Sequence, residues 1–298
     1  MTDGEKTVQR SEAKAARKAQ FRLPGGSILL MVPALVILAL FLVSVIRMIG
    51  LSFIGDDGFT LEHYIQFFSR PDYIEIYIRT VFISFAVTFS CILVGYPMAF
   101  AIWKYKGNRN YLMIAVILPW LVSLVVRTYG WIVILGPRGL INEFLKWVGV
   151  IDSPVKMMFN STGVIIGLTH VLVPFMIISI LSVMLHLNQK LEEASMSLGA
   201  KPLHTFRRIT LPLTMPGIIS GSMLVYLMST GAIVTPILLG GVQDRMVGTQ
   251  MYQEVIQTFN FPKASMLAFL LLIVGLAVII PLQKLEKHFS TGGTTGGN

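Results

Sequence analysis

Residues 264–283 read Ala264-Ser-Met-Leu-Ala-Phe-Leu-Leu-Leu-Ile-Val-Gly-Leu-Ala-Val-Ile-Ile-Pro-Leu-Gln283 and contain no charged side chain. As an α-helix, a stretch of this length extends about 30 Å, which matches the thickness of the hydrocarbon core of a bilayer. A strand of a membrane barrel would instead alternate apolar and polar residues. The stretch therefore predicts a helix that crosses a membrane.

Apolar runs of this kind recur along the chain, and each predicts one membrane span. The predicted spans are 27–52, 79–103, 111–135, 162–186, 215–240 and 264–283. Only helices and closed barrels satisfy every backbone polar group inside a bilayer, and runs this apolar do not suit barrel strands. The sequence therefore predicts an all-α membrane protein with six transmembrane helices, in a membrane domain over 27–283 between two tails, 1–26 and 284–298.

The composition agrees with a membrane protein and excludes several other classes. Charged residues make up 13% of the 298 residues, against about a quarter in an ordinary soluble domain. The single cysteine, Cys91, cannot form an intramolecular disulfide, and no Cys/His set predicts a metal site. The net charge of +9 could indicate nucleic acid or lipid headgroups as partners, but its distribution favours membrane topology over nucleic acid.

Lysine and arginine residues predict the orientation of the spans. The two tails and the loops 104–110 and 187–214 together hold 15 of the 24 basic residues, and the other three loops, with Arg79 at the boundary of the second span, hold seven. By the positive-inside rule, both termini and the 187–214 loop are cytoplasmic. The loops 53–78, 136–161 and 241–263 are then periplasmic.

The first half of the 187–214 loop predicts a short helix that ends abruptly. Apolar residues recur there at helical spacing, at Leu187, Leu191, Ala194 and Leu198. Gly199 follows directly, and glycine readily adopts the positive φ that ends many helices.

The second half of the loop predicts another short helix. Pro202 suits its first turn, and Leu203, Phe206 and Ile209 would form its apolar face. Pro212 is predicted to end this helix before the fifth span. A rigid helical hairpin at a membrane face could dock into a partner and transmit motion, or it could be an amphipathic linker on the lipid headgroups. The residues alone leave both readings open.

The same loop resembles the "EAA loop" of the membrane subunits of type I ABC importers. The resemblance rests on Glu193-Ala194-Ser195, Leu198-Gly199-Ala200, Phe206, Ile209, Leu211-Pro212 and Pro216-Gly217-Ile218, with Ser195 in place of the usual second alanine. It implies coupling helices that sit in a groove of a separate ATPase. The expected coupling residues are Glu193, Ala194, Ser195, Leu198, Gly199, Ala200 and Phe206.

Motifs elsewhere resemble the spermidine/putrescine permease branch of that family, and the first of its two permeases in particular. They are Thr60-Leu-Glu-His-Tyr64, Gly95-Tyr-Pro97, Arg127-Thr-Tyr-Gly130, Gly139-Leu-Ile-Asn-Glu-Phe-Leu145, Val164-Ile-Ile-Gly-Leu168, Pro174-Phe-Met176 and Leu239-Gly-Gly241. The resemblance implies half of a translocation pathway for polyamines in the bacterial inner membrane. It also implies an ATPase dimer, a second homologous permease and a periplasmic solute-binding protein as partners, within membrane lipid.

Catalysis by this chain is not expected. The sequence has no Gly-x4-Gly-Lys-Ser/Thr phosphate loop, so ATP and Mg²⁺ would be bound by the partner ATPase, and this chain would hold no cofactor. It also lacks the His-Glu-x2-His and Gly-x-Ser-x-Gly patterns. An intramembrane enzyme would need a catalytic set that is not visible, and a membrane assembly protein would not need the whole EAA pattern.

The candidate residues of the pathway follow from the charges inside the spans. No Asp or Glu lies within the predicted spans, and apart from Arg79 at the very start of the second span the charges there are Arg47 and Arg127. Arg47 lies near the outer end of its span, where it can reach the interface. Arg127 lies deeper and is expected either to face the pathway or to form a structural pair. Tyr129 and Trp131 flank it and could hold a cation or belong to an interfacial belt.

The lack of intramembrane carboxylates leaves the solute open. A polyamine is a multiple cation, which carboxylates or aromatic cages would bind. Specificity could lie in the binding protein, with an unselective pathway through the membrane. Alternatively, the solute could be another small amino compound, such as an amino acid derivative or an opine, whose carboxylate would suit Arg127.

The predicted topology can be tested with reporter fusions. A reporter fused after residue 284 should be cytoplasmic, and one inserted near residue 150 should be periplasmic, because of the 15-to-7 bias in basic residues. The measurement is the activity of a reporter that works on one side of the membrane only. The opposite result at either site would contradict the orientation.

Overall fold

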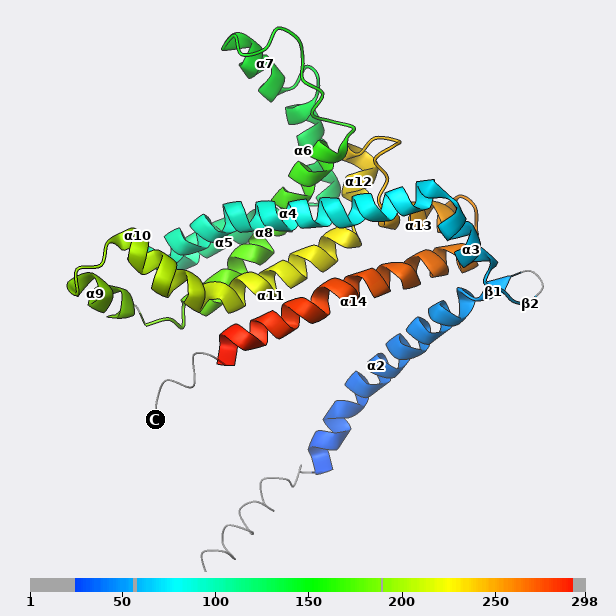
Figure 1. Cartoon of the computed structure of the whole chain (residues 1–298), viewed down its shortest axis with the longest axis horizontal. Helices are drawn as coiled ribbons and strands as arrows, with labels where there is room; N and C mark the ends of the chain where they lie inside the picture. The colour runs from blue at the N-terminus through cyan, green and yellow to red at the C-terminus, as the bar shows by residue number, and fades with distance from the viewer. Residues whose placement is uncertain (1–24, 56–57, 189, 292–298) are drawn as a thin grey trace, which may run out of the picture. The chain divides into compact units, whose positions relative to one another are not determined.

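The computed structural model describes residues 25–55, 58–188 and 190–291. The chain divides into two compact units, residues 1–51 and 52–298. In the first unit, α2 (Gly25–Leu51) is a helix of 27 residues whose apolar stretch is long enough to cross a membrane (Figure 1). This helix agrees with the first predicted span. Of the predicted N-terminal tail, 1–26, residues 1–24 lie outside the described residues.

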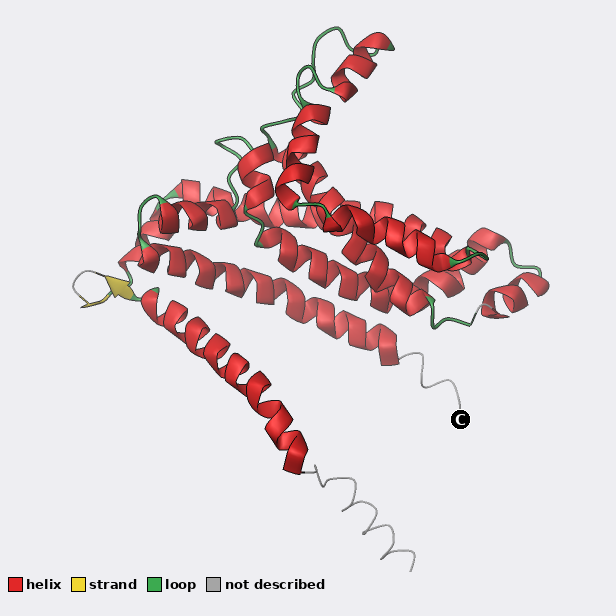
Figure 2. Cartoon of the chain, turned by 180° about the vertical axis from the view of Figure 1, so that it is seen from behind, coloured by secondary structure: helices red, strands yellow, loops and turns green. Residues whose placement is uncertain are grey.

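The second unit is mainly helical (Figure 2). It opens with a small antiparallel hairpin of β1 (Ile54–Gly55) and β2 (Gly58–Phe59), in which Ile54 pairs with Phe59. The next helices are α3 (Glu62–Ser69), α4 (Pro71–Lys104), α5 (Arg109–Leu121), α6 (Leu124–Leu135), α7 (Leu140–Trp147) and α8 (Ser161–Met184). They are followed by α9 (Lys190–Ser197), α10 (Pro202–Thr205), the π-helix η1 (Phe206–Thr210), α11 (Leu211–Thr230), α12 (Val234–Leu239), α13 (Val247–Ile256) and α14 (Phe261–Thr291).

The core of this unit lies between α4, α8 and α11. Figures 1 and 2 both show these helices running alongside one another, with α14 packed on α11. A Cβ atom placed on Gly217 would lie 2.9 Å from the Ser179 carbonyl oxygen, and one on Gly221 would lie 2.8 Å from Met176 Sδ. The two glycines therefore let α11 approach α8 closely, as their GxxxG spacing predicts.

The described residues contain six helical segments long and apolar enough to cross a membrane, as predicted. Two predicted spans nevertheless differ from the structure. The span 111–135 is interrupted at Val122 and Ser123, which are extended, so the third apolar segment runs from Leu124 to Trp147. The span 215–240 is interrupted after Thr230. A run of apolar residues indicates that the segment is buried in lipid or protein. It does not show that the segment is one unbroken helix.

The two ends of the helical unit carry different elements. The α9–α10 hairpin lies at one end of the α4, α8 and α11 helices, and α3 and α13 lie at the other (Figure 1). α4 and α14 are longer than their predicted spans, with 34 and 31 residues. The extra turns at the start of α4 carry charged residues, which places them beyond the hydrocarbon.

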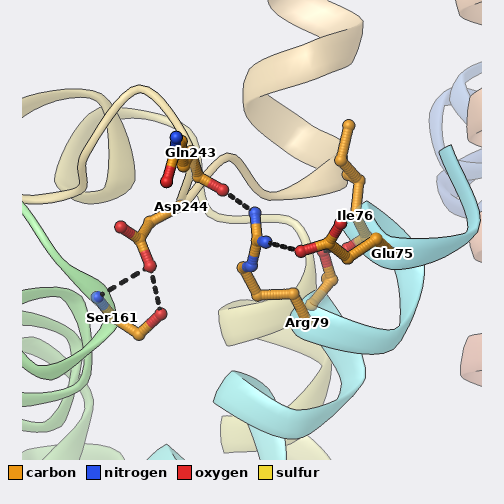
Figure 3. A network of polar contacts seen from close by, with 7 residues as sticks. Glu75, Ile76, Arg79, Ser161, Gln243 and Asp244 are labelled. Atoms are coloured by element: carbon orange, nitrogen blue, oxygen red, sulfur yellow. Dashed lines mark hydrogen bonds and ion pairs between the residues drawn. The ribbon is translucent and has the colours of Figure 1, made fainter. Parts of the chain in front are cut away.

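Polar contacts at the α13 end hold the loop between α12 and α13 against α4 and α8 (Figure 3). Arg79 of α4 pairs with Glu75 and donates a hydrogen bond to the Gln243 carbonyl. The Asp244 carboxylate accepts hydrogen bonds from the Ser161 backbone N–H at 3.1 Å and from its hydroxyl at 2.5 Å. A carboxylate at this position stabilises the first turn of α8, because the first N–H groups of a helix lack intrahelical partners.

A buried carboxylate holds α13 against α14. Glu254 pairs with Lys263 Nζ at 2.8 Å and accepts hydrogen bonds from Gln250 Nε2 at 3.0 Å and Thr258 Oγ1 at 2.9 Å. Burial raises the pKa of Glu254, but the hydrogen bonds and the Lys263 charge together hold that pKa below its ordinary value. Its stabilising effect is therefore present at neutral pH and is lost as the pH falls through the lowered pKa.

Asp244 provides a test of this loop anchor. Asp244→Ala should destabilise the protein by about 1 kcal/mol, because the Ser161 N–H at the start of α8 loses its acceptor. Asp152→Ala is a suitable control, because this side chain is exposed in a loop. The measurement is thermal unfolding of both variants in detergent. Equal unfolding temperatures for the two variants would show that the contact contributes nothing.

Candidate functional site

The 187–214 loop forms the predicted helical hairpin, and Gly199 makes its turn. Gly199 has a φ of +85°, a left-handed conformation that glycine adopts without strain. Its N–H donates to the Met196 carbonyl at 2.9 Å, and the Ala200 N–H donates to the Ser195 carbonyl at 3.2 Å. These bonds close the end of α9, so the prediction for Gly199 is confirmed.

The second arm of the hairpin begins at Pro202 as predicted, but the prediction that Pro212 ends it is wrong. α10, η1 and α11 form one continuous helical run from Pro202 to Thr230. Within it, the Leu211 N–H donates to the Phe206 carbonyl five residues earlier, which is the π-helical pattern. Pro212 follows this widened turn, where the hydrogen-bond pattern shifts by one residue, so its missing N–H does not break the helix.

The two arms of the hairpin are joined by a hydrogen bond between side chains. Ser195 Oγ lies 3.0 Å from Thr205 Oγ1, and Thr205 is buried. Ser195 is the residue that replaces the usual second alanine of the resembled motif. Its hydroxyl therefore ties α9 to α10 in a way that alanine could not.

Phe206 anchors the second arm on α4. Its ring lies edge-on to Tyr96 and to Phe100, with ring centroids 5.7 Å and 5.8 Å away. The Tyr96 hydroxyl lies 3.1 Å from Thr214 Oγ1, one helical turn beyond η1. Phe206 thus faces the body of the protein, and its role is to hold the hairpin in place.

Glu192 makes a second anchor that sequence reasoning missed. It is buried, pairs with Lys104 at the end of α4, and accepts a hydrogen bond from the Thr210 hydroxyl of η1. The Lys104 ammonium also lies 4.5 Å from the centre of the Trp103 ring. Adjacent helical residues point about 100° apart, so the two neighbouring glutamates can have different surroundings. The sequence does not say which of them faces inward.

The residues on the other face of the hairpin are open to solvent. Glu193 and Ala194 are exposed, and Leu198 and Leu203 are 90% and 61% exposed. Large apolar side chains exposed together in this way mark an interaction surface. The predicted coupling residues therefore divide into three groups: Glu193, Ala194 and Leu198 face outward, Gly199 and Ala200 make the turn, and Ser195 and Phe206 hold the hairpin together.

The intramembrane candidates are also divided by the structure. Arg127 and Trp131 are four residues apart on α6 and share one side, and Trp131 lies edge-on to His170 of α8 at 5.5 Å. Tyr129 lies two residues from each, points to another side of α6 and is 56% exposed. The structure therefore groups Arg127 with Trp131 and His170, and not with Tyr129.

Sequence comparisons place the chain among transport proteins. No family model matches it. It is 35% identical over 244 residues to the spermidine/putrescine transport system permease protein PotB of Escherichia coli, across 79% of this chain and 88% of that protein. The PotB protein of Haemophilus influenzae is 35% identical over 242 residues, across 78% and 82%. The inner membrane ABC transporter permease protein YdcU of Escherichia coli is 29% identical, across 76% and 75%.

Solved structures agree on the fold. A chain of a bacterial ABC transporter that imports the acidic polysaccharide alginate has a TM-score of 0.68 at 20% identity, across 96% of this chain and 99% of that chain. A chain of the MetNI methionine ABC transporter, in an inward-facing conformation, has a TM-score of 0.56 at 16% identity, across 72% and 95%. The expected fold of an ABC importer membrane subunit is confirmed.

The Glu192 anchor can be tested by its effect on the hairpin. Glu192→Ala leaves the buried Thr210 hydroxyl without its partner and frees the half-exposed Lys104, which should cost roughly 1–3 kcal/mol. Residues 190–210 should then exchange amide hydrogens faster, as measured by mass spectrometry. Glu193→Ala is the matched control, because the neighbouring carboxylate is exposed. Unchanged exchange in the Glu192 variant would mean that the ion pair does not hold the hairpin.

Proposed function

The chain belongs to the family of ABC importer permease subunits that includes the spermidine/putrescine permeases, and we propose that it forms one half of a translocation pathway for polyamines. The observation that carries the membership is 35% identity to the PotB proteins over most of both chains. Members of this family are transporter subunits and not enzymes. The chain is accordingly a multi-pass protein of the inner membrane.

The exposed face of the hairpin is the proposed contact with the ATPase. Glu193 and Ala194 project from α9, Leu198 directly follows that helix, and Gly199 and Ala200 form the turn beside it. A compact apolar tip with one carboxylate suits a groove of a soluble partner. ATP and Mg²⁺ would be bound by two ATPase subunits, since the sequence of this chain has no phosphate loop.

The contacts of the hairpin explain how ATPase movement would reach the membrane. The second arm continues into α11 without a break, so a displacement of the tip turns or tilts that helix directly. Phe206 and Glu192 connect the hairpin to the end of α4. Two of the three core helices are therefore driven from one surface.

The remaining partners follow from the geometry of a half pathway. A second, homologous permease would supply the opposite wall, and membrane lipid would cover the remaining faces. Both termini would be cytoplasmic, as the basic residues indicate. A periplasmic solute-binding protein would dock at the end that carries α3 and α13. A cavity of about 540 Å³ opens there, and its lining includes Asp72, Glu75, Arg79 and Arg245.

In operation, ATP binding would close the two ATPases and move the hairpin, so that the cavity between the permeases opens outward. The bound solute would enter from the binding protein, and ATP hydrolysis would return the pathway to its inward-facing state. This chain would form the pathway and change its conformation, and ATP hydrolysis would occur on the ATPase.

The polyamine assignment rests on similarity to permeases whose names include spermidine and putrescine. One observation favours the alternative of a small amino compound that bears a carboxylate. Among the charges within the predicted spans, the one that lies deepest is basic, at Arg127. Uptake of labelled spermidine, putrescine and amino acid derivatives by the reconstituted transporter would decide between them. Polyamine uptake alone supports the proposal, and uptake of the carboxylate compounds alone contradicts it.

The hairpin turn provides the sharpest test of coupling. Gly199→Val should abolish spermidine uptake and uncouple or weaken ATP hydrolysis, because a β-branched residue resists a φ of +85° at a cost of roughly 1–3 kcal/mol. Glu193→Arg should give a milder loss, since it reverses one charge and leaves the turn intact. The measurement is uptake and ATPase activity of the reconstituted complex.

Two controls separate coupling from general strain. Gly199→Asn should keep most of the uptake, because asparagine tolerates the left-handed conformation. Gly149→Val introduces the same strain in another loop, where φ is +77°, and should leave coupling intact. If Gly199→Val transports at the native rate with stimulated ATP turnover, the hairpin is only a linker.

A further inference from the structure

One side of α7 carries an apolar stripe that the rest of the described chain leaves exposed. The stripe consists of Leu140, Phe144, Trp147 and Val148, which follow the i, i+4, i+7, i+8 spacing of one helix side. Trp147 is 82% exposed, and its ring centroid lies 6.1 Å from that of Phe144. Large apolar side chains gathered in this way mark a contact surface for an apolar partner.

The other two sides of α7 have different surroundings. Ile141 packs against the core, and Asn142 is buried. Glu143 and Lys146 form an ion pair at 3.9 Å on the remaining side. At about 100° per residue, the apolar stripe, the inward side and the charged side lie roughly 120° apart. A helix with one apolar side and one charged side suits the boundary between lipid and water.

Hydrogen bonds of Asn142 hold α7 in a fixed orientation. Its Nδ2 donates to the Gly136 carbonyl at 2.9 Å and to the Val155 carbonyl at 3.1 Å. Its Oδ1 accepts a hydrogen bond from the Val155 N–H at 2.9 Å. One buried side chain thus joins α7 to the end of α6 and to the segment that leads into α8. The apolar stripe is therefore part of a fixed surface.

α7 lies where the chain leaves the hydrocarbon. It completes the third apolar segment, whose last residue is Trp147, and the connection that follows contains charged residues such as Asp152 and Lys156. Tryptophan is enriched at this depth, because its ring contacts acyl chains while its N–H reaches the headgroups. Figures 1 and 2 both show α7 beyond α6, away from α4, α8 and α11, so the bundle does not cover it.

We propose that α7 binds phospholipid and lies in the headgroup region of the bilayer, with its apolar stripe among the acyl chains. The ion pair of Glu143 and Lys146 then faces water, and the exposed bases Arg138 and Lys156 are available to lipid phosphates. Because Asn142 joins α7 to the end of α6, the bound lipid holds α6 at a fixed depth. This contact goes beyond the proposed function and does not depend on the solute.

The charges of α7 favour phospholipid over a surface of the second permease. Charged residues are depleted in the core of protein–protein interfaces, whereas here an ion pair lies on the side next to the stripe. Headgroups and water can solvate both charges of that pair while acyl chains cover the stripe. The exposed bases at either end of the segment also attract anionic lipids. Contact with the second permease is then an outcome that the experiment can detect.

Neighbouring residues on two sides of α7 provide a matched test. Phe144→Cys and Glu143→Cys would each carry an environment-sensitive fluorophore, in a chain whose single, buried cysteine is replaced by Cys91→Ala. The complete transporter would be placed in nanodiscs of phosphatidylethanolamine and phosphatidylglycerol. The label at position 144 should emit at shorter wavelength and be quenched several-fold more by nitroxide-bearing lipid than by an aqueous quencher. The label at position 143 should show the reverse preference.

Leu140→Cys gives an independent measurement on the same side of α7, and it decides the question if Phe144→Cys does not assemble. Its label should also be quenched mainly by nitroxide-bearing lipid, because it lies one helical turn before Phe144.

Two results overturn the proposal. Quenching of the stripe labels mainly by the aqueous quencher would place the stripe in water. Protection of the stripe labels from both quenchers would show that another subunit covers the stripe. Failure of the native complex to transport spermidine would instead contradict the polyamine function, and the quenching results would still stand.

Discussion

Hydrocarbon supplies no hydrogen-bond partner, so a chain that enters it must satisfy every polar group from within or exclude it. This constraint organises the whole molecule. It places the backbone in helices and confines acidic residues to helix ends and connecting segments. At the end that carries α3 and α13, Asp244 and Arg79 tie a loop to two helices; at the other end, Glu192 and Lys104 do the same for the hairpin. Arg127 is the exception to this constraint, because two of its buried nitrogens make no hydrogen bond within the described residues.

Much of the architecture could be predicted from the sequence because membrane burial leaves a strong compositional signal. The number of apolar segments, the turn at Gly199 and the helix start at Pro202 all follow from single residues or continuous runs. The interruptions at Val122–Ser123 and after Thr230 could not be predicted, because an apolar run is compatible with both a continuous and a broken helix. Pro212 was misread for a related reason, since a π turn before it changes the hydrogen bonds that proline disturbs.

The site was predicted as a segment, but not in its detail. The motif identified the hairpin, yet it gave no way to tell which face of α9 turns inward. Glu192 and Glu193 are chemically identical neighbours, and only the positions of Lys104 and Thr210 separate the structural anchor from the exposed carboxylate. Likewise, Tyr129 and Trp131 both flank Arg127 in the sequence, but helical geometry puts only Trp131 on the Arg127 side.

The π turn of η1 determines how the hairpin would respond to the gain or loss of a residue. A π turn holds one residue more than the hydrogen bonds of an α-helix would enclose, so the second arm and α11 form one helical run but differ in angular phase. Removing one residue there would restore α-helical geometry and rotate the hairpin by about 100° relative to α11. A length change that a loop would absorb would here turn the Leu203 face away from its present direction. The number of residues in this segment therefore fixes the rotation of the hairpin relative to α11.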